Sequence, residues 1–375
     1  MLLKFINKLI ESMFKKKNNE ESHLPLKKSY NIEKSLLSIG ATKIIQRLQN
    51  EGFEAYYVGG CLRDIVLKHR PKDFDVVTNA RPEQIAKLFS SAIIIGRRFK
   101  LVHIRYRNEL IEVATFRKNS MQLTSGAQGI VLEDNTYGTL EDDVIRRDFT
   151  VNALYYDPIK REIIDYVGGL QDAKAKLLKT IGDEQLRFSE DPVRIIRAIR
   201  YANKLKLILS ENTKKSITDK GSLILHVPKA RLYEEFIKCF SKNYAADVLD
   251  SMNELNIARF MIPKNLLMQG KIKKIKKLLS WVNTLSLNKD HQLILIILSF
   301  IAPSLPKINT ELFSKVLIQS IKDFQQLILI PKQLEFSIRS ILLNEKIPLD
   351  LRNKIRPIPE QKNLKILIDD LISKI

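Results

Sequence analysis

The first third of the chain alternates short β-rich runs with helical ones. Between residues 31 and 157, apolar and β-branched runs of four to seven residues are separated by turn residues, a pattern typical of strands. Pro82 suits the first turn of a helix that runs to Phe89, because Ile85, Leu88 and Phe89 fall on one face. Such interleaving predicts a small mixed α/β unit. The expected strands are the runs AYYV, FDVVTN, SAIII, LVHIRY and LIEVATF.

From Ser189 onward the apolar positions recur with a helical period, and prolines interrupt the pattern. The chain is therefore expected to have an α+β fold, with a small mixed α/β head followed by an all-α-helical neck, body and tail. The expected divisions are a basic flexible leader (1–30), the head (31–157), a neck (158–225) and a helical body and tail (226–375).

Composition adds a partner class to this picture. Hydrophobic residues make up 45% and charged residues 28% of the 375 positions, which is ordinary for a globular protein. The formal charge of +21 is unusual, and it favours a polyanionic partner such as nucleic acid or an acidic membrane surface. A Lys-, Ile- and Asn-rich composition produced by drift is the alternative.

The cysteines and the N-terminal segment suggest a reduced, cytoplasmic location. Cys61 and Cys239 are too far apart to suggest a ligand pair, and we expect both to be small buried residues. The broken apolar run at the N-terminus is too short to span a membrane, so no stable membrane insertion is expected. His103, an isolated histidine in an apolar run, is expected to be packed and hydrogen-bonded rather than catalytic.

The segment YYVGGCLRDIVLKHRPKDFDVVTNA carries the first candidate chemistry. Asp73 and Asp75 flank Phe74 in a strand-like run, so both carboxylates are expected on one face. Two close carboxylates repel each other unless a cation or proton lies between them, and Mg²⁺ binds one or two carboxylates together with substrate phosphates. Two such ions can activate a ribose hydroxyl and stabilise a leaving pyrophosphate.

A glycine pair precedes these aspartates. Gly59 and Gly60 allow the backbone to approach a phosphate closely, and Arg63 in the following helix can act as a fork-shaped phosphate donor. An ordinary tight turn is the alternative for the glycines alone. The order strand, Gly-Gly, helix and D-x-D makes that alternative weaker.

These motifs resemble the polymerase-β nucleotidyltransferase superfamily, in its class II branch of bacterial poly(A) polymerases and tRNA CCA-adding enzymes. The resemblance covers roughly residues 35–265. It implies a polymerase-β-like nucleotidyltransferase head, base recognition by the neck (158–225) and RNA binding by the body and tail (226–375). It implies template-independent addition of nucleotides to RNA 3′ ends, with ATP as substrate and two Mg²⁺ ions as cofactors. RNA-decay and RNA-chaperone proteins are candidate partners.

The resemblance leaves two residues as the third catalytic carboxylate. Glu112 lies in the strand-like run ELIEVATF, where polymerase-β topology would put an acid. Asp148 lies in RRDFT, which resembles the motif that handles the ribose and triphosphate, together with Arg147 and Asn152. Asp148 is slightly preferred, and an internal salt bridge with a neighbouring arginine is the alternative for the other acid.

The segment SEDPVRIIRAIR resembles the family's base-reading motif. Ser189 is expected to cap a helix on which Asp191, Arg194 and Arg197 form one stripe. A carboxylate can accept from the exocyclic amine of adenine or cytosine while a guanidinium donates to the adjacent ring nitrogen. The motif therefore permits ATP and CTP and excludes neither.

Two segments favour adenylate addition alone. The run containing Gly96, Arg97 and Arg98 and the helix-like run from Val227 both resemble poly(A) polymerase more than CCA-adding enzymes. Arg97 and Arg98 are candidate phosphate contacts, and Lys273, Lys274 and Lys277 are candidate RNA contacts. The alternatives are a CCA-adding enzyme, a silent RNA-binding protein on the same fold and, more weakly, a Mg²⁺-dependent nucleotide hydrolase.

Overall fold

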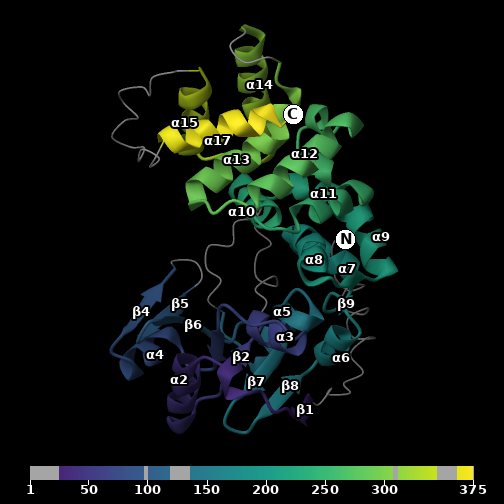
Figure 1. The fold of residues 1–375 in the computed structure, drawn as a ribbon. Coiled ribbons are helices and arrows are strands. Elements are labelled where there is room, and N and C mark those ends of the chain that lie inside the picture. Colours follow the sequence, from purple (N-terminus) through teal and green to yellow (C-terminus); the bar gives the residue numbers. More distant parts are fainter. Residues whose placement is uncertain (1–24, 97–99, 119–135, 307–310, 344–360, 375) are drawn as a thin grey trace, which may run out of the picture. The chain divides into compact units, whose positions relative to one another are not determined.

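The computed structural model describes residues 25–96, 100–118, 136–306, 311–343 and 361–374. The chain divides into two compact units, one ending at Ala175 and the other beginning at Lys176 (Figure 1).

The first unit is built on a mixed sheet, with eight strands among the residues described. The strand order is β1-β8-β7-β2-β3-β6-β5-β4. Neighbouring strands are antiparallel except for the central pair β3 and β6, which is parallel. The strands are β1 (Leu26–Ser29), β2 (Ala55–Val58), β3 (Asp75–Thr78), β4 (Ala92–Ile95), β5 (Leu101–Tyr106), β6 (Glu109–Thr115), β7 (Leu154–Asp157) and β8 (Glu162–Asp165).

Helices cover one face of this sheet. Val76 of β3 and Val113 of β6 are buried in the same cluster as Ile44 of α2 and Ile85 of α4. Because side chains alternate along a strand, Asp75 and Glu112, one residue before these valines, project from the opposite face. The helices and 3₁₀ turns are η1 (Lys34–Leu36), α2 (Ile39–Asn50), α3 (Gly60–Val66), α4 (Pro82–Leu88), α5 (Leu140–Arg146), η3 (Thr150–Asn152) and α6 (Gly169–Lys174).

The strands expected at the centre of the head are confirmed, as is the helix that begins at Pro82. One detail differs, since β3 begins at Asp75 and Asp73 lies just before it. The sheet also extends beyond the range 31–157 predicted for the head. Strand β1 carries exposed side chains throughout and joins the sheet only by pairing with β8, so no apolar pattern marks it in the sequence.

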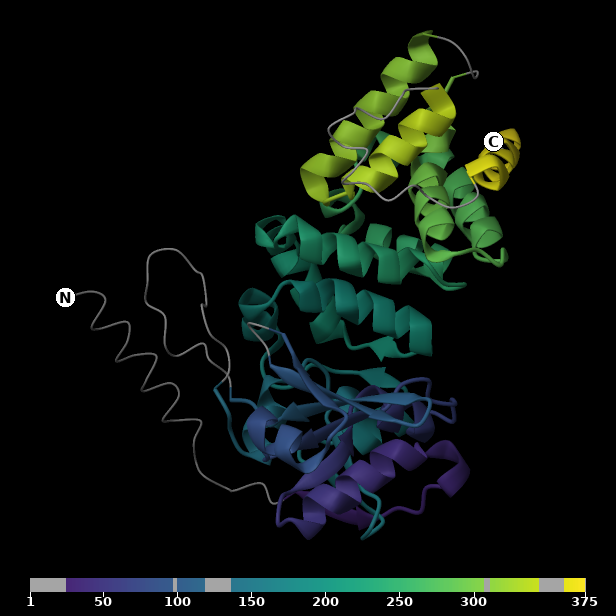
Figure 2. The same cartoon turned by 90° about the vertical axis from the view of Figure 1, so that its left-hand side faces the viewer.

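The second unit is almost wholly helical, as expected (Figure 2). One short pair of parallel strands, β9 (Leu177–Leu178) and β10 (Ile208–Leu209), interrupts the helices. A cluster of phenylalanines that includes Phe236, Phe240 and Phe300 is buried in its core, with ring centroids 4.8 to 5.4 Å apart. The division of this part into neck and body stays a prediction.

The helices of the second unit begin with α7 (Glu184–Glu190) and α8 (Val193–Leu205). The later elements are α9 (Glu211–Lys220), η4 (Gly221–His226), α10 (Lys229–Phe240), α11 (Ala245–Glu254), η5 (Ala258–Phe260), η6 (Lys264–Leu266), α12 (Gln269–Val282), α13 (Lys289–Ile301), η7 (Ala302–Ser304), α14 (Glu311–Leu327), α15 (Lys332–Leu343) and α17 (Gln361–Ser373).

Cys61 and Cys239 are both buried and unbridged, as the sequence predicted. Among the described helices, none combines the length and the apolar content that a membrane crossing requires.

Candidate active site

A glycine turn connects β2 to α3 and forms one wall of the candidate site. Gly59 has φ of 75° and ψ of −127°, a conformation that essentially only glycine adopts without strain. A Cβ on Gly59 would lie 3.5 Å from Nη1 of Arg147, so this guanidinium lies directly beside the turn. The backbone of the glycine turn and the positive charge of Arg147 therefore lie side by side.

Substituting Gly59 tests this conformation. Gly59→Ala is expected to lower the free energy of unfolding by about 1–3 kcal/mol, because alanine is strained at this φ and ψ. The measurement is urea unfolding at constant pH. Gly60→Ala is the matched control, since Gly60 has ordinary φ and its Cβ would only reach ordinary contact with Arg63. Equal stability losses in the two variants would contradict the assignment of strain to Gly59.

Asp75 and Glu112 are cross-strand neighbours on the open face of the sheet. They are partners in the parallel register of β3 and β6. Desolvation, the negative charge of Glu112 and that of Asp73 raise the pKa of Asp75 to about 6, although Arg147 offsets part of the effect. Carboxylates held in mutual repulsion in this way are the arrangement that a divalent cation relieves.

His103 contacts Glu112 from the next strand. The two residues are partners in the antiparallel register of β5 and β6, and His103 Nε2 lies 3.3 Å from Glu112 Oε1. The histidine is therefore hydrogen-bonded, as expected from the sequence, but its partner is a candidate catalytic acid. The register of β5 with β6, which local sequence does not specify, creates this contact.

Asp148 belongs to a different, buried network. Its Oδ1 accepts from Phe149 N at 2.8 Å and from Asn152 Nδ2 at 2.9 Å. Asn152 Oδ1 in turn accepts from Arg63 Nη1 at 2.7 Å, and the Nε and Nη2 atoms of Arg63 donate to Asp64. Asp148 thus orients Asn152 and, through it, a buried arginine next to the glycine turn.

A second buried carboxylate, which the sequence analysis did not single out, holds the two arginines of RRDFT. Asp143 is fully buried and accepts from Arg146, from Arg147 and from the hydroxyl of Tyr155. Although burial raises its pKa, the two guanidiniums hold the pKa of Asp143 below its usual range. The spacing of three and four residues between this acid and the arginines on one helix is the signal that identifies it.

The residues predicted to read the base lie in the second unit, and their local structure corrects one expectation. Ser189 does not cap a helix: it lies inside α7 and donates to Gln185 O. Helix α7 ends at Glu190 and α8 begins after Pro192, because proline has no N–H to continue a helix. Asp191 therefore lies between two helices rather than on the stripe of Arg194 and Arg197.

The described contacts of these residues follow from that break. Asp191 accepts from Val193 N and from Arg231 Nη2, the latter at 3.0 Å. Arg194 donates to Glu190 Oε2 and to Arg187 O, both at 3.0 Å. Asp191 and Arg194 are thus each held by other residues, and reading of a base by this pair stays a prediction, as does the part of Arg197.

The predicted RNA contacts are only partly described. Lys273, Lys274 and Lys277 are exposed on α12. Lys276 on the same helix pairs with Asp250 and is half-buried. Arg97 and Arg98 lie outside the described residues.

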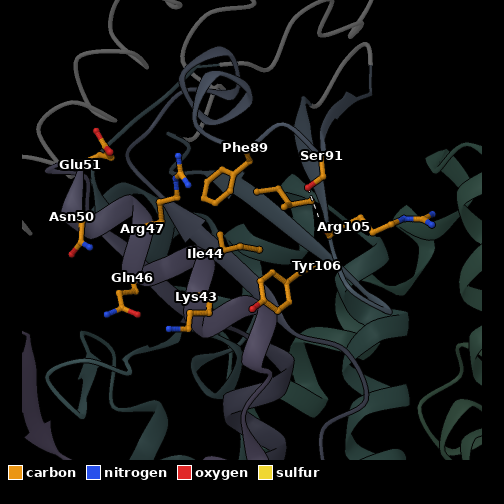
Figure 3. A pocket seen from close by; sticks show the side chains of 11 residues that line it. Lys43, Ile44, Gln46, Arg47, Asn50, Glu51, Phe89, Ser91, Arg105 and Tyr106 are labelled. Atoms are coloured by element: carbon orange, nitrogen blue, oxygen red, sulfur yellow. Dashed lines mark hydrogen bonds between the residues drawn. The ribbon is translucent and has the colours of Figure 1, made fainter.

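A hollow of about 450 Å³ opens elsewhere in the first unit, between α2 and the β4–β5 edge (Figure 3). Ile44, Phe89 and Tyr106 line it, with Arg47 over the Phe89 ring, while the Arg105 side chain points away. Ile104 also lines it, so the hollow lies on the helix-covered face, opposite Asp75 and Glu112. It is therefore separate from the acidic site.

The acidic side chains of this site could supply only part of the ligands of a metal ion. In the parts of the chain that the structure describes, no three His, Cys, Asp or Glu side chains converge closely enough to enclose an ion. Mg²⁺ needs fewer protein ligands than this, because substrate phosphates and water complete its shell. Asp75 and Glu112, paired across two strands, are side chains of the type that such an ion binds, so the residues present fit it.

Two segments of the chain match families of known proteins. Residues 55–179 match the poly A polymerase head domain, and residues 206–265 match a region described as the probable RNA and SrmB-binding site of polymerase A. The chain is 47% identical over 208 residues to poly(A) polymerase I of Haemophilus influenzae, covering 54% of this chain and 46% of that protein. It is 38% identical over 202 residues to the CCA-adding enzyme of Lactobacillus helveticus, covering 53% and 49%.

The fold is also that of solved relatives. The crystal structure of the Bacillus stearothermophilus CCA-adding enzyme in complex with CTP matches with a TM-score of 0.64 and 23% identity, over 89% of this chain and 76% of that one. The chain spans about half the length of the curated relatives it matches. The segment that matches the poly A polymerase head domain contains the glycine turn and the acidic strand pair, so this part of the chain is a nucleotidyltransferase head domain similar to that of poly(A) polymerase I.

Proposed function

We propose that this protein adds AMP from ATP to RNA 3′ ends without a template. The observation that carries the proposal is the pairing of Asp75 with Glu112 on the open face of the sheet, in the same head domain as the Gly59–Gly60 turn and Arg147. The poly(A) polymerase I relatives are more similar in sequence than the CCA-adding relatives, which favours adenylate as the nucleotide.

In the proposed reaction, the RNA 3′ oxygen forms a bond to the ATP α-phosphorus and pyrophosphate leaves. Asp73 and Asp75, helped by Glu112, would hold two Mg²⁺ ions, which supply charge neutralisation at the attacking and leaving oxygens. Gly59 and Gly60 offer close backbone approach to the triphosphate, and Arg147 offers positive charge beside it. The protein contributes mainly positioning and electrostatic stabilisation.

A primer-extension assay tests the proposal. The purified protein with Mg²⁺ is given an oligo(A) primer or a tRNA lacking its CCA end, with ATP, CTP or both. Long tails on oligo(A) with ATP alone are expected. Addition of two C and one A to the tRNA, followed by a stop, would assign CCA addition instead. RNA binding without incorporation on either substrate would leave a binding protein.

The RNA path is proposed to include Lys273, Lys274 and Lys277 of α12. Replacing all three with alanine should weaken RNA binding and reduce the slope of log affinity against log salt by about 2, since each phosphate contact on a single strand contributes about 0.7. The measurement is a salt titration of RNA binding by fluorescence anisotropy. Lys276→Ala is the matched control, because Lys276 already pairs with Asp250. An unchanged slope in the triple variant would remove α12 from the RNA path.

A further inference from the structure

Asp143 is the most completely enclosed carboxylate of the candidate site, and no step proposed above uses it. Its side chain has no exposed surface, while the two arginines that it binds retain 29% and 18% of theirs. Isolated charges are expensive to bury, so a carboxylate in this position needs several charge-assisted donors. Asp143 has donors on both oxygens.

Each oxygen of Asp143 accepts from a different arginine side chain, and Oδ1 also accepts from Arg117 N at 3.4 Å. Oδ1 accepts from Arg146 Nε at 2.8 Å and from Nη2 of the same side chain. Oδ2 accepts from Arg147 Nε at 3.0 Å, from Arg147 Nη2 at 2.7 Å and from Tyr155 Oη at 2.8 Å. The Nε and Nη2 atoms of each guanidinium therefore donate to one carboxylate oxygen, and this pair of hydrogen bonds fixes the plane of the guanidinium as well as its position.

The hydrogen bonds to Asp143 determine the direction in which Nη1 of Arg147 points. With Nε and Nη2 bound to Asp143, Nη1 extends toward Asn152 O at 3.4 Å and toward the Gly59 turn. The Tyr155 hydroxyl accepts from Arg147 Nε at 2.8 Å, and its ring lies beneath the guanidinium. The charge of Arg147 also acts on Asp75. Arg147 thus borders the Gly59–Gly60 turn, and its positive charge reaches Asp75 of the acidic pair.

We infer that Asp143 is a positioning residue for the triphosphate: it holds Arg147 in the orientation that receives the β- and γ-phosphates of the incoming nucleotide. Asp143 does not touch the substrate and acts only through the arginine. The inference rests on the proposed function, because it assumes that a nucleoside triphosphate binds at the glycine turn.

The test compares two ligands that differ only in the phosphates concerned. In the full chain with Mg²⁺, Asp143→Asn is expected to raise the Kd for ATP about tenfold, because an uncharged amide cannot grip the guanidinium as the carboxylate does. The Kd for AMP should stay within about twofold. Isothermal titration calorimetry measures both below the unfolding temperature of the variant.

A matched control distinguishes a specific effect on the position of Arg147 from a general loss of rigidity in the first unit. Asp165→Asn removes another buried carboxylate of the same unit, one that accepts from the backbone of residues 167–170 and has no place in the site. It should change the affinities for ATP and AMP by the same factor. If Asp143→Asn does not fold, Arg147→Lys is the alternative variant, because lysine keeps the positive charge but lacks the planar pair of guanidinium donors. It should show the same selective loss of affinity for ATP.

Unchanged ATP affinity in Asp143→Asn, or equal losses for ATP and AMP, would overturn the inference. Failure of the proposed function has a different signature, because the unaltered protein would then bind ATP without extending RNA. In that case the selective loss of ATP affinity would still establish Asp143 as a positioning residue of a nucleotide site.

Discussion

Asp75→Asn is expected to lower the rate of AMP incorporation by about 10³-fold or more. The substitution removes half of the D-x-D pair and the carboxylate that lies nearest Glu112 in the strand register. Metal ions in such sites supply several kcal/mol of transition-state stabilisation, and about 4 kcal/mol corresponds to a factor of about 10³. Single-turnover extension of oligo(A) with saturating ATP measures the chemical step directly.

The same substitution should not destabilise the metal-free protein. The pKa of Asp75 in the folded chain is about 6, above its ordinary value of 3.8, so the ionised carboxylate costs stability at a pH above 6. The penalty is absent below the unfolded-state pKa, grows as pH rises from that value to the folded pKa, and is complete above the folded pKa. At pH 8 in EDTA, Asp75→Asn should raise the free energy of unfolding by up to about 1 kcal/mol, reduced by screening at an exposed carboxylate.

These two results together separate a catalytic role from a structural one. If the variant is inactive but at least as stable as the original protein, the substitution has removed a catalytic function and has not disrupted the fold. Activity within tenfold of the original protein would remove Asp75 from the metal site. A large loss of stability at pH 8 would instead show that the carboxylate is satisfied by groups other than a metal.

The sequence was sufficient for features that depend on neighbouring positions. Three features follow from local conformational preference and the two-residue period of a strand: the strand that ends just before Gly59, the helix that begins at Pro82 and the projection of Asp75 away from the core. The helical character of the second unit likewise follows from the helical period of its apolar positions. These features need no knowledge of which elements meet in space.

Features that depend on pairing between distant segments could not be obtained in this way. Nothing in ELIEVATF specifies that its strand lies parallel to β3, yet that choice places Glu112 beside Asp75. Strand β1 shows the same limit, since its exposed residues carry no pattern and only the partner β8 defines it. Burial of Asp143 is also a tertiary property, although its spacing from the arginines was visible.

One local signal was misjudged. Pro192 was present in the sequence, and its missing N–H favours the start of a helix over the middle of one. Giving that signal priority over the Ser189 cap predicts two helices with Asp191 between them, which is the observed arrangement.

The identity of the third catalytic carboxylate leads to the second large expected effect. Glu112 pairs with Asp75 and is among the charges that shift its pKa, together with Arg147 and Asp73. We therefore expect Glu112→Gln to lower the maximal rate by about 10²-fold or more at saturating ATP, because it weakens the same metal site. Glutamine keeps the size of the side chain and its ability to accept from His103.

Asp148→Asn should behave differently, although it also removes a carboxylate. Asp148 is buried and accepts from Asn152, which in turn accepts from Arg63, so its loss disturbs the wall of the nucleotide site rather than the acidic pair. The expected result is a higher KM for ATP and a loss of about 1–3 kcal/mol in unfolding free energy, the cost of disrupting a buried hydrogen-bonded group. Steady-state kinetics in ATP, with urea unfolding of each variant, separates the two patterns. If Asp148→Asn abolishes the maximal rate while Glu112→Gln changes only KM, Asp148 is the residue that completes the metal site.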